Sequence, residues 1–136
     1  MQHSPAMTTV GEIMSADLIS VERADSVATA AGIMAAAGVG SALIMEDGRL
    51  LGIFTERDIL TSLRREPQTA LDHPVADWMT PDPITVSSDL SVLDALGLML
   101  RGGFRHLPVV SGEKVVGIIS LRDLAKDLAQ GLERPG

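Results

Sequence analysis

Apolar residues in the first half of the chain recur with two spacings, and each spacing predicts a different kind of element. Residues 41–45 and 50–54 are short apolar runs on either side of Asp47-Gly48, a dipeptide typical of two-residue hairpin turns. In residues 27–34 the apolar positions recur every three or four residues, which is the helical period. The expected elements are, in order, a helical turn at 9–14, a strand at 18–21, a helix from 27 that ends at Gly38, strands at 41–45 and 50–54, and a helix at 55–65. This is a β-α-β-β-α unit.

The second half of the chain repeats the first. When the sequence is shifted by 65 residues, residues 10–60 overlay residues 75–125 without a gap and share fifteen identical positions. Two repeats are too few for a solenoid, so they are expected to pack on each other as a pair. The expected boundaries are a first repeat at 8–65, a linker at 66–74, a second repeat at 75–130, and flexible tails at 1–7 and 131–136.

Composition narrows the classes of function. The 136 residues are 46% hydrophobic, and 18 acids against 11 bases give a formal charge of −7, which argues against general binding to nucleic acid or to an anionic membrane surface. The chain has no cysteine, which excludes disulfides, thiolate chemistry and cysteine-based zinc sites. The first residues have neither a basic region nor an apolar core of the signal-peptide kind, so a cytoplasmic location is expected.

Ser26 to Met45 form a run of twenty residues without a charge, which is long enough to suggest a transmembrane helix. We reject this interpretation because the run is mostly small residues and because Gly38-Val39-Gly40 interrupts it. The equivalent stretch of the second repeat carries Asp94 and Arg101, and one fold must serve both repeats.

A seven-residue motif occurs once in each repeat, as Gly-Ile-Phe-Thr-Glu-Arg-Asp at 52–58 and as Gly-Ile-Ile-Ser-Leu-Arg-Asp at 117–123. Each copy reads as a buried strand that runs into the N-terminus of a helix. Such a junction presents amide N–H groups and the positive end of the helix dipole, which suit an anion. A carboxylate just inside the helix is suited to two neighbouring hydroxyls, such as those of a ribose. The motifs therefore predict two related pockets for a nucleotide-like ligand.

The same residues have a purely structural interpretation. Thr55 with Asp58, and Ser120 with Asp123, match the capping box of a helix N-terminus. A duplicated fold would duplicate its caps, so the repetition of the motif leaves both interpretations open.

Other residues point away from catalysis. The sequence has no Walker loop, no serine–histidine–acid spacing of a hydrolase and no second ligand at a suitable spacing from His106 for a metal site, so we expect no enzyme activity and no required cofactor. Four methionines at repeated positions are interpreted as core residues, and Trp78 as a packing residue. They are Met14, Met34, Met79 and Met99.

These patterns together resemble a CBS-domain pair, or Bateman module, of the stand-alone bacterial signalling type. The resemblance covers roughly residues 8–128 and rests on the tandem unit, on Met-Thr-Pro-Asp-Pro-Ile-Thr-Val at 79–86, on Arg-His-Leu-Pro-Val-Val at 105–110 and on the doubled motif. It implies a pseudo-two-fold pair that binds adenosine-containing ligands in two clefts between the repeats. It also implies a homodimer assembled through the helices.

Carried over residue by residue, the resemblance assigns ribose contacts to the acid of each motif and ribose or phosphate contacts to its hydroxyl. It assigns adenine contacts to the first strand of the opposite repeat. The site of Asp58 and Thr55 would use Asp82, Ile84 and Thr85. The site of Asp123 and Ser120 would use Asp17, Ile19 and Ser20. Phosphate contacts are implied for Arg105 and His106, and Arg57 and Arg122 could reach phosphate or lie in solvent.

Gly40 and Ser41 stand where the second repeat has Arg105 and His106, so the two sites are expected to be unequal. The leading hypothesis is a non-catalytic sensor of AMP, ADP or ATP, with NAD or S-adenosylmethionine as further candidates, that acts on an unknown effector protein. The alternative is a ligand-free homodimerisation or protein-interaction module in which the motifs are only helix caps.

Overall fold

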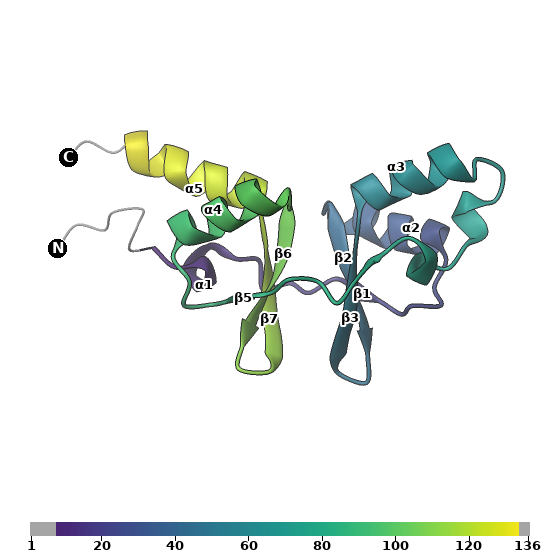
Figure 1. The fold of residues 1–136 in the computed structure, drawn as a ribbon, viewed down its shortest axis with the longest axis horizontal. Coiled ribbons are helices and arrows are strands. Elements are labelled where there is room, and N and C mark those ends of the chain that lie inside the picture. Colours follow the sequence, from purple (N-terminus) through teal and green to yellow (C-terminus); the bar gives the residue numbers. More distant parts are fainter. Residues whose placement is uncertain (1–7, 134–136) are drawn as a thin grey trace. The chain divides into compact units, whose positions relative to one another are not determined.

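The computed structural model describes residues 8–133, which form two compact units (Figure 1). One unit comprises residues 18–83. The other comprises residues 8–17 together with residues 84–133, so the first described residues of the chain belong to the unit of the second repeat. The tail expected at 1–7, and the last three residues of the tail expected at 131–136, lie outside the described residues.

The unit of residues 18–83 is a four-stranded sheet with helices on one face (Figure 1). Its strand order is β1-β2-β3-β4, in which β1 pairs with β2 in parallel and the other neighbours are antiparallel. Its elements are β1 (Ser20–Val21), α2 (Val27–Ala37), β2 (Ser41–Glu46), β3 (Arg49–Thr55), α3 (Glu56–Arg65), the 3-10 turns η2 (Ala70–Asp72) and η3 (Val75–Asp77), and β4 (Thr80–Pro81).

The other unit repeats this arrangement with a three-stranded sheet. Its strand order is β5-β6-β7, with β5 and β6 parallel and β6 and β7 antiparallel. Its elements are α1 (Val10–Ile13), β5 (Val86–Ser87), α4 (Val92–Gly102), β6 (His106–Ser111), β7 (Lys114–Ser120) and α5 (Leu121–Glu133). The predicted α/β class and the β-α-β-β-α order are confirmed.

Local sequence signals account for the helix ends. The hydroxyl of Ser26 accepts a hydrogen bond from the Thr29 N–H at 3.0 Å, and Ser91 does the same for the Asp94 N–H at 3.1 Å. Both helices end in a left-handed residue, for which glycine has no steric penalty. These residues are Gly38 (φ 69°) and Gly103 (φ 72°).

The hairpin of β2 and β3 turns as predicted. Asp47 and Gly48 have φ values of 51° and 76°, and two consecutive positive φ angles define the type I′ turn that matches the twist of antiparallel strands. The uncharged run from Ser26 to Met45 does not form one helix, because it divides into α2 and β2. Among the described residues, no helix is long and apolar enough to span a membrane.

The sequence prediction differs from the structure at several elements. Strands β1 and β5 are two residues long, and β1 is shorter than the predicted strand at 18–21, because only these residues pair with β2 and β6. The predicted linker contains η2, which packs against α2 and α3. Helix α5 continues to Glu133, beyond the expected end at residue 130.

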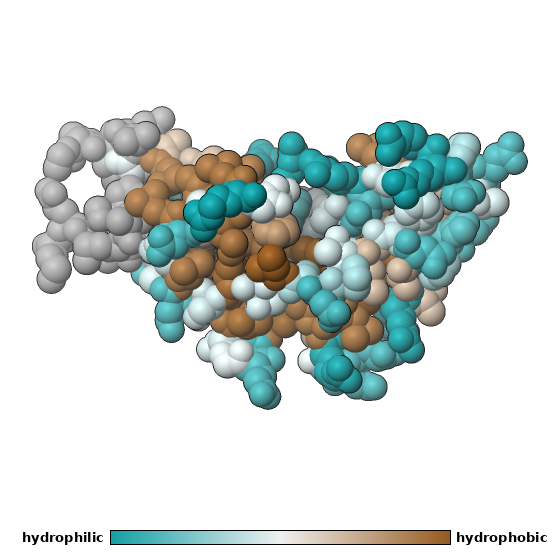
Figure 2. Space-filling view, viewed as in Figure 1, coloured by the Kyte–Doolittle hydropathy of each residue, from teal (hydrophilic) through white to brown (hydrophobic). Residues whose placement is uncertain are grey.

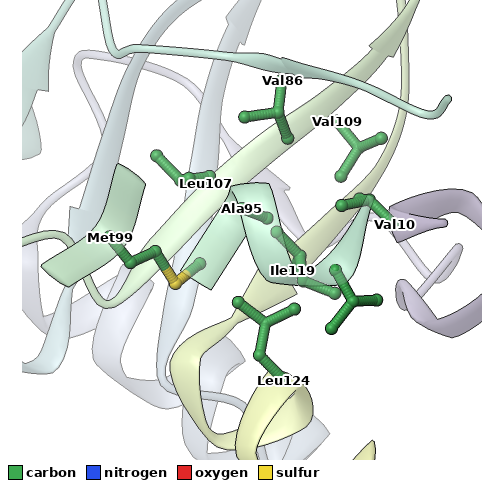
Figure 3. Close-up of a cluster of buried hydrophobic side chains, with 9 residues drawn as sticks. Val10, Val86, Ala95, Met99, Leu107, Val109, Ile119 and Leu124 are labelled. Atoms are coloured by element: carbon green, nitrogen blue, oxygen red, sulfur yellow. The ribbon is translucent and has the colours of Figure 1, made fainter. Parts of the chain in front are cut away.

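Each unit has its own apolar core. In the unit of residues 8–17 and 84–133, Figure 3 shows Val10 of α1 pointing into a cluster from α4, α5 and the sheet. Val10 is completely buried there. The buried members of this cluster are Val10, Val86, Val92, Ala95, Met99, Leu107, Val109, Ile119 and Leu124. The core interpretation of the methionines is confirmed, since Met34 and Met99 are buried and Met14 and Met79 pack against the two clusters.

The segments that lead into the two repeats are exchanged. We call residues 8–17 the first leading segment and residues 73–82 the second leading segment. In the first, the Val10 N–H donates to the Leu90 carbonyl at 2.8 Å, and Thr8 accepts from the Val92 N–H at 2.8 Å. In the second, the equivalent bonds join Val75 to Asp25 and Val27 to His73, at 2.8 and 2.9 Å. Each leading segment therefore packs on the helix of the other repeat.

Candidate functional site

The motif of residues 52–58 forms a complete capping box. The Thr55 N–H donates to Oδ2 of Asp58 at 2.9 Å, and the Asp58 N–H donates in return to Oγ1 of Thr55 at 3.4 Å. The Thr55 hydroxyl also lies 3.3 Å from the same Oδ2 atom. These bonds hold the carboxylate at the N-terminus of α3.

The motif of residues 117–123 forms the same arrangement at the start of α5. The Ser120 N–H donates to Oδ2 of Asp123 at 3.3 Å, and the Asp123 N–H donates to the Ser120 hydroxyl at 3.1 Å. The predicted caps are therefore present in both repeats.

The caps leave room for a ligand role. In each motif the reciprocal bonds use Oδ2, and within residues 8–133 no hydrogen bond involves Oδ1 of Asp58 or Asp123. A carboxylate oxygen has two lone pairs, so Oδ1 of each acid can accept from ligand hydroxyls while Oδ2 caps the helix. Capping and binding are compatible roles for the same side chain.

The carboxyl of Asp58 is partly buried. Burial raises the pKa of Asp58 above its ordinary value of 3.8, although the hydrogen bonds from Thr55 and the nearby Arg57 guanidinium favour the charged form. The guanidinium of Arg57 is exposed, as is that of Arg122 in the other motif.

The glycine that opens each motif has a steric role that the sequence analysis missed. A Cβ atom on Gly52 would lie 2.8 Å from the Thr80 carbonyl oxygen and 2.6 Å from the sulfur of Met79. A Cβ atom on Gly117 would lie 2.8 Å from the Ser15 carbonyl oxygen and would also overlap Met14. Each glycine thus lets a leading segment cross the strand just before the capping box.

Hydrogen bonds hold these crossings together. In one unit, β4 pairs with β3 so that Thr80 lies opposite Ile53. In the other, Ser15 and Ile118 exchange both backbone hydrogen bonds at 2.9 Å. The sequence signal that could have pointed to these crossings is the repeat itself, since Ser15 is equivalent to Thr80 and Ile118 to Ile53.

The predicted phosphate residues lie beside the second motif. Strand β6 starts where β7 ends, so that His106 is opposite Ser120, and the carbonyl of Arg105 accepts from the Leu121 N–H at 2.8 Å. In the other unit the equivalent contacts are made by residues with no charge. Ser41 lies opposite Thr55, and the carbonyl of Gly40 accepts from the Glu56 N–H at 3.1 Å.

The remaining predicted contacts are divided between the units. Asp82 lies in the unit of Asp58, where its N–H donates to the Leu51 carbonyl at 3.0 Å and its φ of 45° is left-handed. Ile84 and Thr85, which were assigned to the same site, belong to the other unit and are exposed, Ile84 by 47%.

The residues predicted around Asp123 are divided in the same way. Asp17 ends the first leading segment and lies in the unit of Asp123. Ile19 and Ser20 belong to the unit of residues 18–83, in which the Ile19 carbonyl accepts from the Leu43 N–H at 2.9 Å.

Trp78 and His73 are held in the second leading segment. Their rings meet edge to face with centroids 6.1 Å apart, and Nδ1 of His73 lies 2.9 Å from Oδ2 of Asp77. The packing interpretation of Trp78 is confirmed, because its ring contacts the core of its unit. Its buried Nε1 atom has no hydrogen-bond partner among the described residues. No cluster of three or more His, Asp or Glu side chains in residues 8–133 could hold a metal ion.

Comparison with known proteins identifies the family. The sequence profile of the CBS domain matches residues 10–65 and 75–130. The chain belongs to the CBS domain family. This CBS pair is 39% identical over 123 residues to an uncharacterized 17.7 kDa protein of Acidianus ambivalens, which covers 89% of this chain and 73% of the relative. Longer relatives also exist, since the pair spans 19% of the CBS domain-containing protein CBSCBSPB5 of Arabidopsis thaliana, with 36% identity over 102 residues.

Solved structures support the assignment. The CBS-domain protein ATU1752 of Agrobacterium tumefaciens matches with a TM-score of 0.85 and 30% identity, over 88% of this chain and 98% of that one. Two further matches were solved with ligands. CBSX2, in complex with AMP, has a TM-score of 0.77 and 28% identity over 93% of this chain and 99% of its own. The pair of MJ0100, in complex with 5′-methylthioadenosine and S-adenosyl-L-methionine, has a TM-score of 0.82 and 27% identity over 91% and 98%.

Proposed function

We propose that this CBS pair is a non-catalytic sensor of adenine nucleotides that regulates an effector protein. The observation that carries the proposal is the arrangement at the start of α5. There Oδ1 of Asp123 is open to hydroxyl donors, the helix N-terminus favours an anion, and Arg105 and His106 lie at the adjoining strand end. A ribose next to a phosphate matches this combination of groups.

The role of each residue follows from its position. Asp123 and Ser120 would bind the ribose hydroxyls, and Arg105, His106 and Arg122 would bind phosphate. Asp58 and Thr55 would bind a second ribose at the start of α3, with Arg57 beside it. Backbone and aliphatic contacts to adenine would come from two segments, with Asp82, Ile84 and Thr85 serving Asp58, and with Asp17, Ile19 and Ser20 serving Asp123.

Two structural neighbours support an adenosine ligand, one with AMP and one with 5′-methylthioadenosine and S-adenosyl-L-methionine. AMP, ADP and ATP are our first candidates, and NAD and S-adenosylmethionine follow. Binding would act on an effector only through a difference in ligand affinity between two states of the pair.

The test is a titration of the full chain with AMP, ADP and ATP. Calorimetry measures the affinity, and thermal unfolding measures the stabilisation. A ligand at 100 times its dissociation constant adds about 2.7 kcal/mol to the free energy of unfolding. For a domain of this size, that is a rise of roughly 5–15 °C in the unfolding temperature. The Asp123→Asn variant should lose the effect, because an amide keeps the cap acceptor and loses the charge.

Asp94→Asn is the matched control. Asp94 follows the capping hydroxyl Ser91 by three residues, as Asp123 follows Ser120, but its side chain is exposed at the start of α4. Binding should survive in this control. If no adenine nucleotide binds protein freed of carried-over nucleotide, or if Asp58→Asn, Asp123→Asn and the double variant all bind normally, the sensor function is wrong.

A second candidate function, assembly with a second copy of the chain, is favoured by the surface of α4. Leu93 and Leu100 are 43% and 66% exposed and seven residues apart, so they lie on one stripe of the helix together with Gly97. Figure 2 shows hydrophobic surface in the region where Figure 1 draws α4.

The charges beside this stripe are complementary to those of a second, antiparallel copy of the helix. Asp94 and Arg101 are also seven residues apart and flank the same side of the leucine pair. If two α4 helices pair antiparallel about a two-fold axis, Asp94 of one copy faces Arg101 of the other, twice. We therefore propose a homodimer through α4.

Sedimentation velocity tests this interface. Leu100→Asp should give a monomer, whereas Leu60→Asp, on an equally exposed leucine of α3, should not. Arg101→Asp should weaken the dimer, and Asp94→Arg added to it should restore the dimer. A wild-type monomer at all concentrations, or a dimer insensitive to Leu100→Asp, would exclude α4 as the interface.

A further inference from the structure

The two motifs differ in charge at equivalent positions. In the unit of residues 18–83, the residue after the capping hydroxyl is Glu56, so the exposed Arg57 has an acidic residue on either side of it in the sequence. In the other unit the same position is the apolar Leu121, and the arginine of the motif has a single acid next to it.

The neighbouring strand enlarges this difference. The backbone carbonyl of residue 40 or 105 accepts from the first N–H of the helix in each unit, so these two residues occupy the same place beside the motif. That place holds Gly40 beside α3 and the exposed Arg105 beside α5. The α3 motif thus has one arginine against two carboxylates, and the α5 motif has two arginines against one.

A phosphate group would meet these surroundings differently. At the α5 motif, two guanidinium groups can form charge-assisted hydrogen bonds to phosphate oxygens. At the α3 motif, Glu56 lies at the first position of the helix, where a phosphate would approach the helix N-terminus, and its carboxylate would repel the phosphate. Asp58 lies beside this position, and burial raises the pKa of its carboxyl even though Thr55 and Arg57 favour its charged form.

We infer that the α3 motif binds an adenosine derivative whose 5′ substituent carries no negative charge, while the α5 motif binds the phosphate-bearing nucleotide. The inference rests on the proposed function, in which Asp58 and Asp123 each bind a ribose. It adds the ligand class of each motif and names Glu56 and Arg105 as the residues that determine it.

The experiment compares AMP with 5′-methylthioadenosine, which keeps the adenosine and replaces the phosphate with an uncharged thioether. Both are titrated by calorimetry into the full chain and its variants. Asp123→Asn should weaken AMP at least tenfold and leave the thioether nucleoside within twofold. Asp58→Asn should do the reverse. Arg105→Ala should weaken AMP alone, and it acts through an exposed side chain that the fold does not require.

A gain-of-function variant makes the test independent of losses caused by misfolding. In the Asp123→Asn background, Gly40→Arg with Glu56→Leu gives the α3 motif the charge of the α5 motif. This variant should bind AMP at least tenfold more tightly than Asp123→Asn alone, and Asp58→Asn added to it should abolish the gain.

The results distinguish an error in the ligand class of each motif from the absence of adenosine binding. If both ligands bind but Asp58→Asn and Asp123→Asn weaken each of them equally, the assignment of ligand classes is wrong and the adenosine sites remain. The assignment also fails if the charge exchange leaves AMP binding unchanged. If neither ligand binds the wild-type chain, the proposed function fails, and this inference fails with it.

Discussion

Met14 lies across the backbone of Gly117, and Met79 lies across Gly52 in the same way. In both pairs a Cβ atom on the glycine would overlap the leading segment, 2.8 Å from a backbone carbonyl oxygen. The two residues of each pair come from different repeats. The glycine that opens the motif therefore belongs to the joint between the repeats as much as to the motif itself.

We expect Gly117→Ala and Gly52→Ala to destabilise the protein by about 1–3 kcal/mol each, because a backbone carbonyl must move to make room for the methyl group. Urea unfolding measures the change. The control is Gly32→Ala in the middle of α2, where the added methyl group has no atom within 4 Å apart from its chain neighbours and its own helix backbone. That variant should stabilise the helix by roughly 0.5–1 kcal/mol. Equal effects at Gly32 and Gly117 would contradict the steric role of the crossing.

Truncation of Val10 should weaken the second repeat rather than the first. Its side chain is completely buried in the core built by α4, α5 and β5–β7, so Val10→Ala should cost about 2 kcal/mol. Hydrogen exchange should then accelerate in β6 and β7 more than in β2 and β3. Val39→Ala, at a valine that is 36% exposed, should change the free energy of unfolding by less than about 0.5 kcal/mol. Faster exchange in β2 and β3 instead would contradict the exchanged arrangement.

The raised pKa of Asp58 predicts a pH dependence of stability. Between 3.8, the ordinary pKa of an aspartate, and the higher native pKa, the folded state binds more protons than the unfolded chain, so the free energy of unfolding falls as the pH rises. The stabilisation by the protonated form is complete below pH 3.8 and is lost as the pH passes the native pKa.

Asp58→Asn removes this titration and retains an acceptor for the Thr55 N–H. Urea unfolding of ligand-free protein should therefore show the wild type losing stability relative to this variant as the pH rises from 3.8 towards neutrality. A wild type that instead gains stability over Asp58→Asn in that range would mean that the capping bonds outweigh burial.

Salt should separate the two ligand classes. If exposed arginines such as Arg105 bind phosphate, then AMP affinity should fall as salt rises from about 0.1 to about 1 M, because the Debye length shortens from about 10 to about 3 Å. The affinity for 5′-methylthioadenosine should change little over the same range. The salt dependence for AMP should become smaller in Arg105→Ala. An equal salt dependence for both ligands would argue against a phosphate contact.

Features that depend on neighbours in the chain were predictable from the sequence. The capping boxes of Thr55 and Ser120 join residues three positions apart, and the turn at Asp47-Gly48 needs only its own two φ angles. The apolar spacing in 27–34 likewise describes one helix face. Hydrogen bonding and sterics over a few residues decide each of these features, so the order of elements and the candidate binding motifs followed from the residues alone.

The partner of each leading segment was decided only by tertiary packing. Val10 and Val75 are equivalent positions, and the helices at Val27 and Val92 offer the same N–H donor to either segment. A repeated sequence is therefore equally compatible with each segment packing on its own repeat or on the other one. Contacts between residues far apart in the chain decide between these two arrangements. The same contacts explain the glycine of each motif and the burial of Asp58, because a crossing segment and a desolvated carboxylate exist only once distant residues have come together.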